Sequence, residues 1–487
     1  MQAFIGLDVG TSAIKGVLIT EDGHQVARAV RPVEFIRPKP GYVEIVPDDH
    51  YRSVCEIINE LISKLSPGAS VKALSMAFAS GNMLMLDGAY QPLTNIISWL
   101  DKRSLGMTPD LLPDLDTEQF HHIVGWNWTE LFPLSQFAWH RKFAPDTYQK
   151  ACRFCMNSDY LMFRLTGEWG IDPSTASTIF LQDQMAMAWH PSYLGALGIA
   201  EKTLSRIMPS GAVLGKLTDE AAAETGLGRD TLVVLGAFDH PCAARGTGCF
   251  ATGSMLLSCG TSWVGFYPIE DRELAISQRL LVDPFLKPSG PWGAMFALTA
   301  VAVEVDWYIE NLISSKASAA EKYSDFNQAA LESNPGAGGL RINPFQRSPE
   351  KLASLNTRSE RANLARALME GAAFEMRRKI EMLAEAGIGA HNLTMVGGPT
   401  NSPIWPRIVA QIVGLELKLI NGQTAGAVGA AVLAAVGAGR FRNEEQALLA
   451  LGGSANIIEP DGPCGDKYES LYRAYLAEYP SAAAKTR

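Results

Sequence analysis

A short pattern occurs twice in this chain, once near the start of each half. The first copy is Asp-Val-Gly-Thr-Ser at 8–12, and the second is Ser-Cys-Gly-Thr-Ser at 258–262. Apolar residues precede and follow both copies, which predicts two β-hairpins with Gly-Thr-Ser at their turns. Glycine lets a backbone come close to a phosphate, while threonine and serine hydroxyls donate hydrogen bonds to it. Either copy alone would be an ordinary hairpin turn, but the pair predicts two related halves that hold one polyphosphate between them.

The two copies differ at their first residue, which is Asp8 in one and Ser258 in the other. A carboxylate at this position could hold Mg²⁺ through water, so we expect the metal at the first copy. Lys15 follows on the outgoing strand and could reach a phosphate. A solvated lysine on a strand is an equally simple interpretation of that residue.

The composition is that of a globular protein with a large core, since 47% of the 487 residues are hydrophobic and 19% are charged. This length suits two or three domains. The formal net charge of −9 argues against nucleic acid or an anionic membrane as the main partner, although small anions can still bind a local nest of N–H groups. The chain opens into a strand without the pattern of a signal peptide, and the apolar run 425–438 is too short to span a bilayer. We therefore expect a cytoplasmic protein with no membrane partner.

The seven cysteines are scattered, and the pair Cys152 and Cys155 has no second pair to accompany it. A structural zinc site needs four ligands, so we expect no metal there. Buried thiols in a reducing compartment are the simpler interpretation.

Strand and helix patterns alternate along the chain, which predicts the α/β fold class. We expect a boundary near residue 248, giving domains at 1–247 and 248–487. Asp48 or Asp49 is expected to cap a helix through 54–62, and a Gly/Ala-rich helix after Thr424 is expected to pack tightly on a sheet. The other expected helices cover 105–150, 159–165, 302–312 and 362–385, and the expected strands cover 4–7, 14–19, 71–78, 84–86, 93–99, 232–237, 255–267 (a hairpin) and 393–396.

Asp239 follows the apolar run 232–237, at the point where a buried strand gives way to a helix of small residues. Ligand sites in open α/β sheets lie at the carboxyl ends of strands. A carboxylate there could take the proton from an attacking hydroxyl in phosphoryl transfer. The competing interpretation is structural, because Asp before His-Pro is also a good helix N-cap with proline in the first turn.

Two further segments offer chemistry with an equally simple structural alternative. Trp99, Asp101 and Arg103 combine a stacking face, a carboxylate and a forked donor, which suits a polyol; a surface Asp–Arg pair beside a buried tryptophan is the alternative. Gly397 and Gly398 follow an apolar strand and would let a flat ring approach the backbone, or they simply form a strand-to-helix turn.

These segments, taken in order, resemble the FGGY carbohydrate kinases over nearly the whole chain. The run 5–12 is similar to the first phosphate loop of that family, and 259–262 to the second. The run 236–248 resembles its G-x-x-D-x-x-x-A-x-G-x-G stretch. Further similar segments are 41–44 (G-W-V-E), 99–103 (W-x-D-x-R), 159–168 (D-Y-L-x-x-x-L-T-G-E), 172–177 (D-x-S-x-A-S), and 366–371 with 397–398 and 402–405 (the C-terminal signature).

The resemblance implies two ribonuclease-H-like domains of the actin and hexokinase type around a central cleft, with ATP and Mg²⁺ as cofactors and a sugar or polyol as substrate. It places Asp239 as the catalytic base and Asp8 at the metal. It is compatible with a homodimer. By the same resemblance the nucleotide contacts are Gly10, Thr11, Ser12, Lys15, Gly260, Thr261, Gly397, Gly398 and Asn401, and the substrate contacts are Ser80, Gly81, Asn82, Trp99, Asp101, Arg103 and Asp239.

Some positions depart from the family pattern. Xylulokinase-like members carry Gly-Gln-Met-His-Gly where this chain has Ala-Ser-Gly-Asn-Met at 79–83, so the polar groups for a sugar are reduced to Ser80 and Asn82. Pro399 replaces the third glycine of the adenosine turn, and the run 99–104 is nearer to the W-A-D-N-R-S of gluconate kinases.

The sequence therefore predicts ATP-dependent phosphorylation of a ketopentose such as xylulose. The alternatives are a kinase for gluconate or another polyol, a sugar- and nucleotide-binding sensor that has lost catalysis, and an actin-like ATPase clamp. Retention of both Asp8 and Asp239 argues against the sensor, and the 99–103 segment would have no purpose in the clamp.

Overall fold

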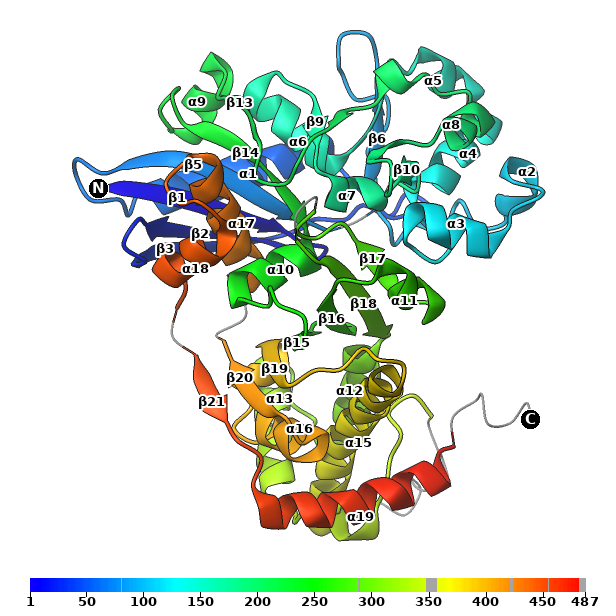
Figure 1. The fold of residues 1–487 in the computed structure, drawn as a ribbon, viewed down its shortest axis with the longest axis vertical. Helices are drawn as coiled ribbons and strands as arrows, with labels where there is room; N and C mark the ends of the chain where they lie inside the picture. The colour runs from blue at the N-terminus through cyan, green and yellow to red at the C-terminus, as the bar shows by residue number, and fades with distance from the viewer. Residues whose placement is uncertain (80, 288–289, 347–356, 421–423, 454, 481–487) are drawn as a thin grey trace. The chain divides into compact units, whose positions relative to one another are not determined.

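The computed structural model describes residues 1–487 except 80, 288–289, 347–356, 421–423, 454 and 481–487 (Figure 1). The chain divides into two compact units that share the sequence unevenly. The first unit comprises Met1–Phe250, Ile269–Ala294 and Thr424–Gly453, and the second comprises Ala251–Pro268, Met295–Gln423 and Ser454–Arg487. The division into domains at residue 248 stays a prediction, although two segments of the second half belong to the first compact unit.

The main sheet of the first unit has the strand order β13-β14-β5-β1-β2-β3. Its first two strands form the predicted antiparallel hairpin, and β1 then pairs in parallel with β5, which pairs in parallel with β14. Three parallel strands therefore end at one edge of the sheet. The strands are β1 (Gln2–Val9), β2 (Ala13–Thr20), β3 (Gln25–Pro32), β5 (Ser70–Phe78), β13 (Val213–Lys216) and β14 (Leu232–Phe238).

Helices cover both faces of this sheet, because alternate residues of β1 are buried on opposite sides. Ile5 and Leu7 pack with α1 (Pro47–Ile62), α6 (Asn157–Thr166) and α9 (Asp219–Thr225). Phe4 packs on the other face with the Gly/Ala-rich helix α17 (Ala425–Gly437), which also packs against α10 (Asp239–Thr247) (Figure 1).

On this second face, glycines let α17 lie very close to β1 and to α10. A Cβ added at Gly6 would overlap the carbonyl oxygen of Ala427, and one added at Gly429 would overlap the carbonyl oxygen of Cys242 in α10. Side chains at these positions would push the backbones apart. The expectation that the Gly/Ala helix packs tightly on a sheet is confirmed for the described residues, which do not include Gly422.

A smaller sheet in the same unit has the strand order β4-β7-β6-β8. It includes strands in both of the segments 84–86 and 93–99 where strands were predicted, and Met83 of β6 lies opposite Ile97 of β7. Its strands are β4 (Glu44–Ile45), β6 (Met83–Leu86), β7 (Ile96–Ile97) and β8 (Arg153–Met156), and α7 (Pro173–Ser177) follows β9 (Gly170–Ile171).

The second unit repeats the arrangement of hairpin and parallel strand. Its strands are part of a sheet of order β17-β18-β16-β15-β19-β20-β21, with β15 and β16 antiparallel and β15 and β19 parallel, where β17 is Leu281–Asp283 and β18 is Trp292–Leu298. The strands are β15 (Ser254–Cys259), β16 (Trp263–Ile269), β19 (Asn392–Gly397), β20 (Glu416–Leu419) and β21 (Asn456–Ile458), and the helices are α12 (Val301–Tyr308), α13 (Ala319–Leu331), α15 (Arg358–Glu385), α16 (Trp405–Val413) and α19 (Gly462–Glu478).

None of the helices in the described part of the chain is both long and apolar enough to cross a membrane.

The helices and strands not yet given bounds complete the two units. The remaining helices are α2 (Thr108–Leu111), α3 (Thr117–Val124), α4 (Pro133–Phe143), α5 (Pro145–Lys150), α8 (Pro191–Leu197), α11 (Arg272–Ser277) and α18 (Glu444–Leu451), and the remaining strands are β10 (Gln182–Asp183), β11 (Ala188–Trp189) and β12 (Arg206–Ile207).

Three local predictions were wrong. Neither Asp48 nor Asp49 caps α1, because the helix begins at Pro47 with Val46 at the N-cap position. Proline supplies a fixed φ there, so no side-chain cap is required. The single helical stretch expected over 105–150 is broken into α2 to α5, with prolines near the start of α2, α4 and α5. The thiol of Cys152 is exposed rather than buried, whereas that of Cys155 is buried.

The core of the first unit contains an ionisable carboxyl at the start of α6. Asp159 is buried, and its oxygens accept hydrogen bonds from the amide N–H of Met156 at 2.7 Å and the hydroxyl of Ser205 at 2.5 Å. Burial raises the pKa of Asp159 from 3.8 to about 6, more than these hydrogen bonds lower it. The folded protein therefore binds this proton more tightly than the unfolded chain does.

The stability contributed by the protonated form of Asp159 should be complete below about pH 4 and lost as the pH rises through 6. Between pH 5 and pH 8 we expect the free energy of unfolding to fall by about 1 kcal/mol more in the wild type than in Asp159→Asn. Urea titrations at both pH values measure this difference. Asp219→Asn, at an exposed position paired with Arg229, is the control and should follow the wild type. Parallel pH curves for the wild type and Asp159→Asn would contradict the expectation.

Candidate active site

The carboxyl edge of the main sheet gathers the predicted catalytic residues of the first unit. Val9 lies opposite Phe78, and Phe78 lies opposite Phe238, so the residues that follow β1, β5 and β14 emerge side by side. These residues begin the first Gly-Thr-Ser turn, the predicted sugar segment 79–82, and α10 with Asp239 as its first residue. Pairing in register therefore brings together three motifs that are far apart in the sequence.

Asp239 is not the N-cap of α10, because Phe238 occupies that position. The side chain of Asp239 is 29% exposed, yet its Oδ1 atom is buried and accepts no hydrogen bond from any described residue. The ring nitrogen Nε2 of His240 lies 3.9 Å from that oxygen. Leaving a buried carboxylate oxygen without a donor costs free energy, which the structural role of a helix cap does not explain.

Asp8 and Lys15 face each other across the first hairpin. They are opposite each other in the strand register, and Lys15 Nζ lies 3.7 Å from Asp8 Oδ2. Burial raises the pKa of Asp8 to about 6, while Lys15 opposes this rise and the neighbouring charge of Asp239 adds to it. Burial also raises the pKa of Asp239, and His240 and Lys15 lower it in part. The two carboxylates thus form one electrostatic site in which negative charge is costly until a cation or proton compensates it.

The start of α17 lies against this site. A Cβ added at Gly426 would come within 3.1 Å of the carboxyl carbon of Asp8. Glycine at this position keeps the space above the Asp8 carboxyl open. The close packing of α17 on β1 therefore also shapes the surroundings of the predicted metal residue.

The first Gly-Thr-Ser turn is joined to the predicted sugar strand by a hydrogen bond. The indole Nε1–H of Trp99 donates to the hydroxyl oxygen of Thr11 at 3.1 Å. Within the turn, the amide of Gly10 donates to the carbonyl of Ala13 at 3.2 Å. Because the Thr11 hydroxyl accepts from Trp99, its own hydrogen remains available for a ligand.

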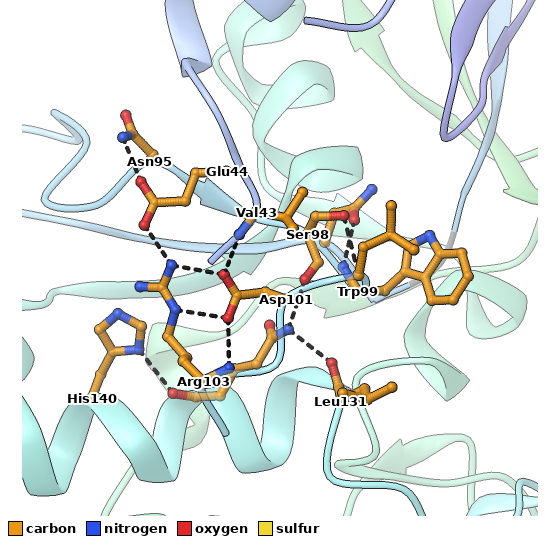
Figure 2. Close-up of polar contacts among 12 residues, drawn as sticks. Val43, Glu44, Asn95, Ser98, Trp99, Asp101, Arg103, Leu131 and His140 are labelled. Atoms are coloured by element: carbon orange, nitrogen blue, oxygen red, sulfur yellow. Dashed lines mark hydrogen bonds and ion pairs between the residues drawn. The ribbon is translucent and has the colours of Figure 1, made fainter. Parts of the chain in front are cut away.

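Asp101 and Arg103 form a buried network rather than a surface pair (Figure 2). The fully buried carboxylate of Asp101 accepts from the amide of Val43 at 2.6 Å, from the amide of Arg103 at 2.8 Å, and from Nε and Nη2 of Arg103 at 2.9 and 2.8 Å. Arg103 also pairs with Glu44, and its guanidinium lies 3.9 Å from the centre of the Tyr42 ring. These bonds tie the 41–44 segment to the 99–103 segment.

This network favours a positioning role for Asp101 and Arg103. Four hydrogen bonds use the accepting capacity of the Asp101 carboxylate. Beside it, the amide of Gln136 donates to the carbonyls of Ser98 and Leu131 and holds the same turn. Direct contact of Asp101 and Arg103 with a substrate stays a prediction, and Trp99 in the same turn is half-buried.

The predicted substrate segment after β5 also supports Trp99. The side-chain oxygen of Asn82 accepts from the amide of Trp99 at 3.0 Å. Gly81 has φ of +74°, and a Cβ there would lie 2.7 Å from the ring of Phe132, so glycine is required. Ser80 lies outside the described residues. The roles of Ser80, Gly81 and Asn82 toward a substrate stay predictions.

The second Gly-Thr-Ser turn differs from the first by one residue of register. Gly260 donates to the carbonyl of Ser262 at 3.1 Å, and Ser258 lies opposite Val264 rather than opposite a charged residue. The amide of Ala300 donates to the hydroxyl of Ser262 at 3.2 Å. Gly260 and Thr261 are exposed, as a nucleotide contact requires, but their role stays a prediction.

Gly397, the last residue of β19, and Gly398, which follows it, have different surroundings. Gly397 has φ of +102°, and a Cβ there would overlap the backbone of Cys259, so this glycine permits the close pairing of β15 with β19. Gly398 has open space around its Cα, and Asn401 is exposed. The hydroxyl of Thr400 donates to the carbonyl of Gly397 at 2.7 Å and closes the turn. An adenosine contact at Gly397, Gly398 and Asn401 stays a prediction.

A buried polar cluster beside Asp239 was not predicted as part of the site. It contains Ser174, Asp283 and Arg245, all of them fully buried. The signal in the sequence was the 172–177 segment, but nothing in the chain order indicated that Asp283 would lie beside it. Local sequence patterns do not indicate which polar residues far apart in the chain will become partners.

Comparison with known proteins places this arrangement in a family. Models of the N-terminal and C-terminal domains of the FGGY family of carbohydrate kinases match residues 3–246 and 255–438. The xylulose kinase of Bacillus subtilis (strain 168) is 27% identical over 98% of this chain and 97% of that relative.

Solved structures agree with the same fold class. The crystal structure of xylulose kinase from Rhodospirillum rubrum matches with a TM-score of 0.82 and 25% identity over 98% of both chains. The crystal structure of gluconate kinase from Lactobacillus acidophilus matches with a TM-score of 0.84 and 21% identity over 100% of both chains. The predicted α/β fold of the actin and hexokinase type is thereby confirmed, and the chain belongs to the FGGY family of carbohydrate kinases.

Proposed function

We propose that this protein transfers the γ-phosphoryl group of ATP to a hydroxyl of a ketopentose such as xylulose, with Asp239 as the catalytic base. The observation that carries the proposal is the buried, unpartnered carboxylate oxygen of Asp239 at the carboxyl edge of the sheet, beside Asp8 and Lys15. As the hydroxyl oxygen bonds to phosphorus, its proton passes to Asp239. The bond from phosphorus to the bridging oxygen breaks, and ADP leaves with that electron pair.

Asp8 fits Mg²⁺, because this ion takes carboxylate oxygens as ligands. Burial makes the negative charge of Asp8 costly, and a bound cation would compensate that charge. When bound, Mg²⁺ would neutralise charge on the phosphate oxygens. Lys15 holds the Asp8 carboxyl in place at 3.7 Å and could add a second positive charge near a phosphate. The hydroxyl of Thr11, held by Trp99, would donate to the nucleotide.

A second candidate substrate is gluconate. The run Trp-Leu-Asp-Lys-Arg-Ser at 99–104 is nearer to the gluconate-kinase pattern, and few polar side chains stand at 79–83 to contact a ketose. Xylulose is favoured by the similarity to xylulose kinases over nearly the whole chain. A sensor without catalysis would have no use for a buried carboxylate oxygen of Asp239 that accepts no hydrogen bond from the described residues.

The substrate assignment predicts the outcome of a panel of acceptors. We expect release of ADP from ATP to be fastest with xylulose among pentuloses, hexuloses, aldonates and polyols, measured with a coupled assay at saturating Mg²⁺. A higher kcat/KM for gluconate than for xylulose would replace the first substrate with the second. ADP release that no acceptor stimulates would remove the kinase proposal.

Asp239→Asn should fold, because the carboxamide has the same shape and no cap hydrogen bond is lost. It cannot accept the proton of the attacking hydroxyl, so turnover should fall by about 10²–10⁴-fold while the affinity for ATP changes little. The control is Asp230→Asn, an exposed aspartate paired with Lys216, which should keep wild-type turnover. A folded Asp239→Asn with near-normal turnover would exclude this residue as the base.

The asymmetry of the two hairpins predicts different consequences at their first residues. Asp8→Ala removes the proposed metal ligand, so the Mg²⁺ concentration for half-maximal turnover should rise at least tenfold. Ser258→Ala is the matched control at the equivalent position of the second hairpin, opposite Val264, and should leave the Mg²⁺ dependence unchanged. Mg²⁺ titrations of both variants decide this. Equal shifts in the two variants would show that the asymmetry has no bearing on the metal.

A further inference from the structure

Ser174 of α7 forms a hydrogen bond to the backbone at the point where β14 ends and α10 begins. The amide N–H of Phe238, the residue before Asp239, donates to the hydroxyl oxygen of Ser174 at 3.2 Å. The same hydroxyl donates its hydrogen to Asp283 Oδ2 at 2.6 Å. Ser174 and Asp283 are fully buried, and α7, which carries Ser174, packs against β14. A two-step hydrogen-bonded chain therefore fixes the backbone from which Asp239 projects.

The far end of α10 has its own anchor. Arg245 donates from Nη1 to the carbonyl of Pro241 at 3.3 Å and from Nη2 to the carbonyl of Phe285 at 2.5 Å. Its Nε lies 2.9 Å from a carboxylate oxygen of Glu444, and its guanidinium lies 4.6 Å from the centre of the Phe285 ring. Arg245 thus secures the later part of α10, while Ser174 bonds the backbone N–H of Phe238 at its start.

Asp283 is the acceptor that orients the Ser174 hydroxyl. A hydroxyl has one hydrogen, and donating it to Asp283 turns a lone pair toward the Phe238 amide. The other oxygen of Asp283 is buried and has no partner among the described residues. Burial raises the pKa of Asp283 to about 7, against the opposing effects of Ser174 and Arg245, and Asp172 adds to the rise. The neutral acid is thus well populated near neutral pH, so a neutral amide is a close substitute for it.

We infer that Ser174 and Asp283 are positioning residues that hold the Asp239 carboxylate in line with the attacking hydroxyl. The inference rests on the proposed function, in which Asp239 is the base. Neither residue needs to touch the substrate, since each acts through the backbone of Phe238. Small displacements of a reacting group are costly, because about 1 Å of misplacement can reduce a rate by about 10²-fold.

Ser174→Ala should lower kcat by about tenfold to a hundredfold while KM for ATP stays near the wild-type value. Ser177→Ala is the matched control, because Ser177 is equally buried on the same helix, and its hydroxyl contacts Pro173, Gln182 and Gln184 but neither Phe238 nor Asp283. It should keep wild-type kcat. Melting temperatures check that both variants fold. Equal kcat in the two variants would overturn the inference.

Two variants of Asp283 test the second link and also decide the matter if Ser174→Ala does not fold. Asp283→Asn retains an oxygen that accepts from Ser174 and should keep kcat within about threefold of the wild type. Asp283→Ala removes the acceptor and should lose kcat as Ser174→Ala does. Similar losses of kcat in both Asp283 variants would overturn the role of the hydrogen-bonded chain.

A double-mutant cycle separates positioning from general damage to the protein. In the Asp239→Asn background, adding Ser174→Ala should cause less than a twofold further loss of kcat, because no base remains to be positioned. A further tenfold loss of kcat would mean that Ser174 acts independently of Asp239. That result would overturn the inference about Ser174 and leave the proposed function standing. Failure of the proposed function has a different signature, since Asp239→Asn by itself would then turn over like the wild type.

Discussion

The candidate site depends on the parallel pairing of β1, β5 and β14. Parallel strands in one sheet all end at the same edge, so a register that sets Val9 opposite Phe78 and Phe78 opposite Phe238 brings their successors together. Asp8, the end of β5 and Asp239 meet for this reason. Any slip of one residue in β14 would also turn its core side chains to the other face, so burial of the strand protects the alignment of Asp239, the proposed base.

Close backbone contacts at glycines let α17 pack beside this edge of the sheet. Gly6 of β1 and Gly429 of α17 let α17 approach both the sheet and α10, which begins with Asp239. At the start of α17, Gly426 stands over the Asp8 carboxyl. The same packing that buries the apolar face thus covers one side of the Asp8 carboxyl, and both Asp8 and Asp239 are mostly buried in the folded protein. That burial is the largest cause of their raised pKa values.

Sequence patterns predicted the strands, the alternation of elements and the family, because these depend on local periodicity and on turn residues. The first hairpin, β5, β14 and the long helix α15 all appear where the apolar spacing placed them. Patterns failed where the partner is distant in the chain. The sequence gives Asp101 and Arg103 as neighbours, but only the fold shows that Val43 and Glu44 complete a buried network around them. Asp283 lies 2.6 Å from Ser174 for reasons of tertiary packing that no spacing rule contains.

The two copies of the hairpin share their backbone arrangement but differ in the charge beside the turn. Both copies have an antiparallel hairpin followed by a parallel strand, so both offer a Gly-Thr-Ser turn beside the carboxyl end of a sheet. In the first copy the register places Asp8 opposite Lys15, and a charged pair stands beneath the turn. In the second copy the pairing register is shifted by one residue, so Ser258 lies opposite Val264. Neither residue of this pair carries a charge. A carboxylate that binds a cation would repel a phosphate wherever no cation intervenes. Charge in one hairpin only is therefore the arrangement expected if the first turn contacts phosphate through a metal and the second contacts it through neutral donors alone.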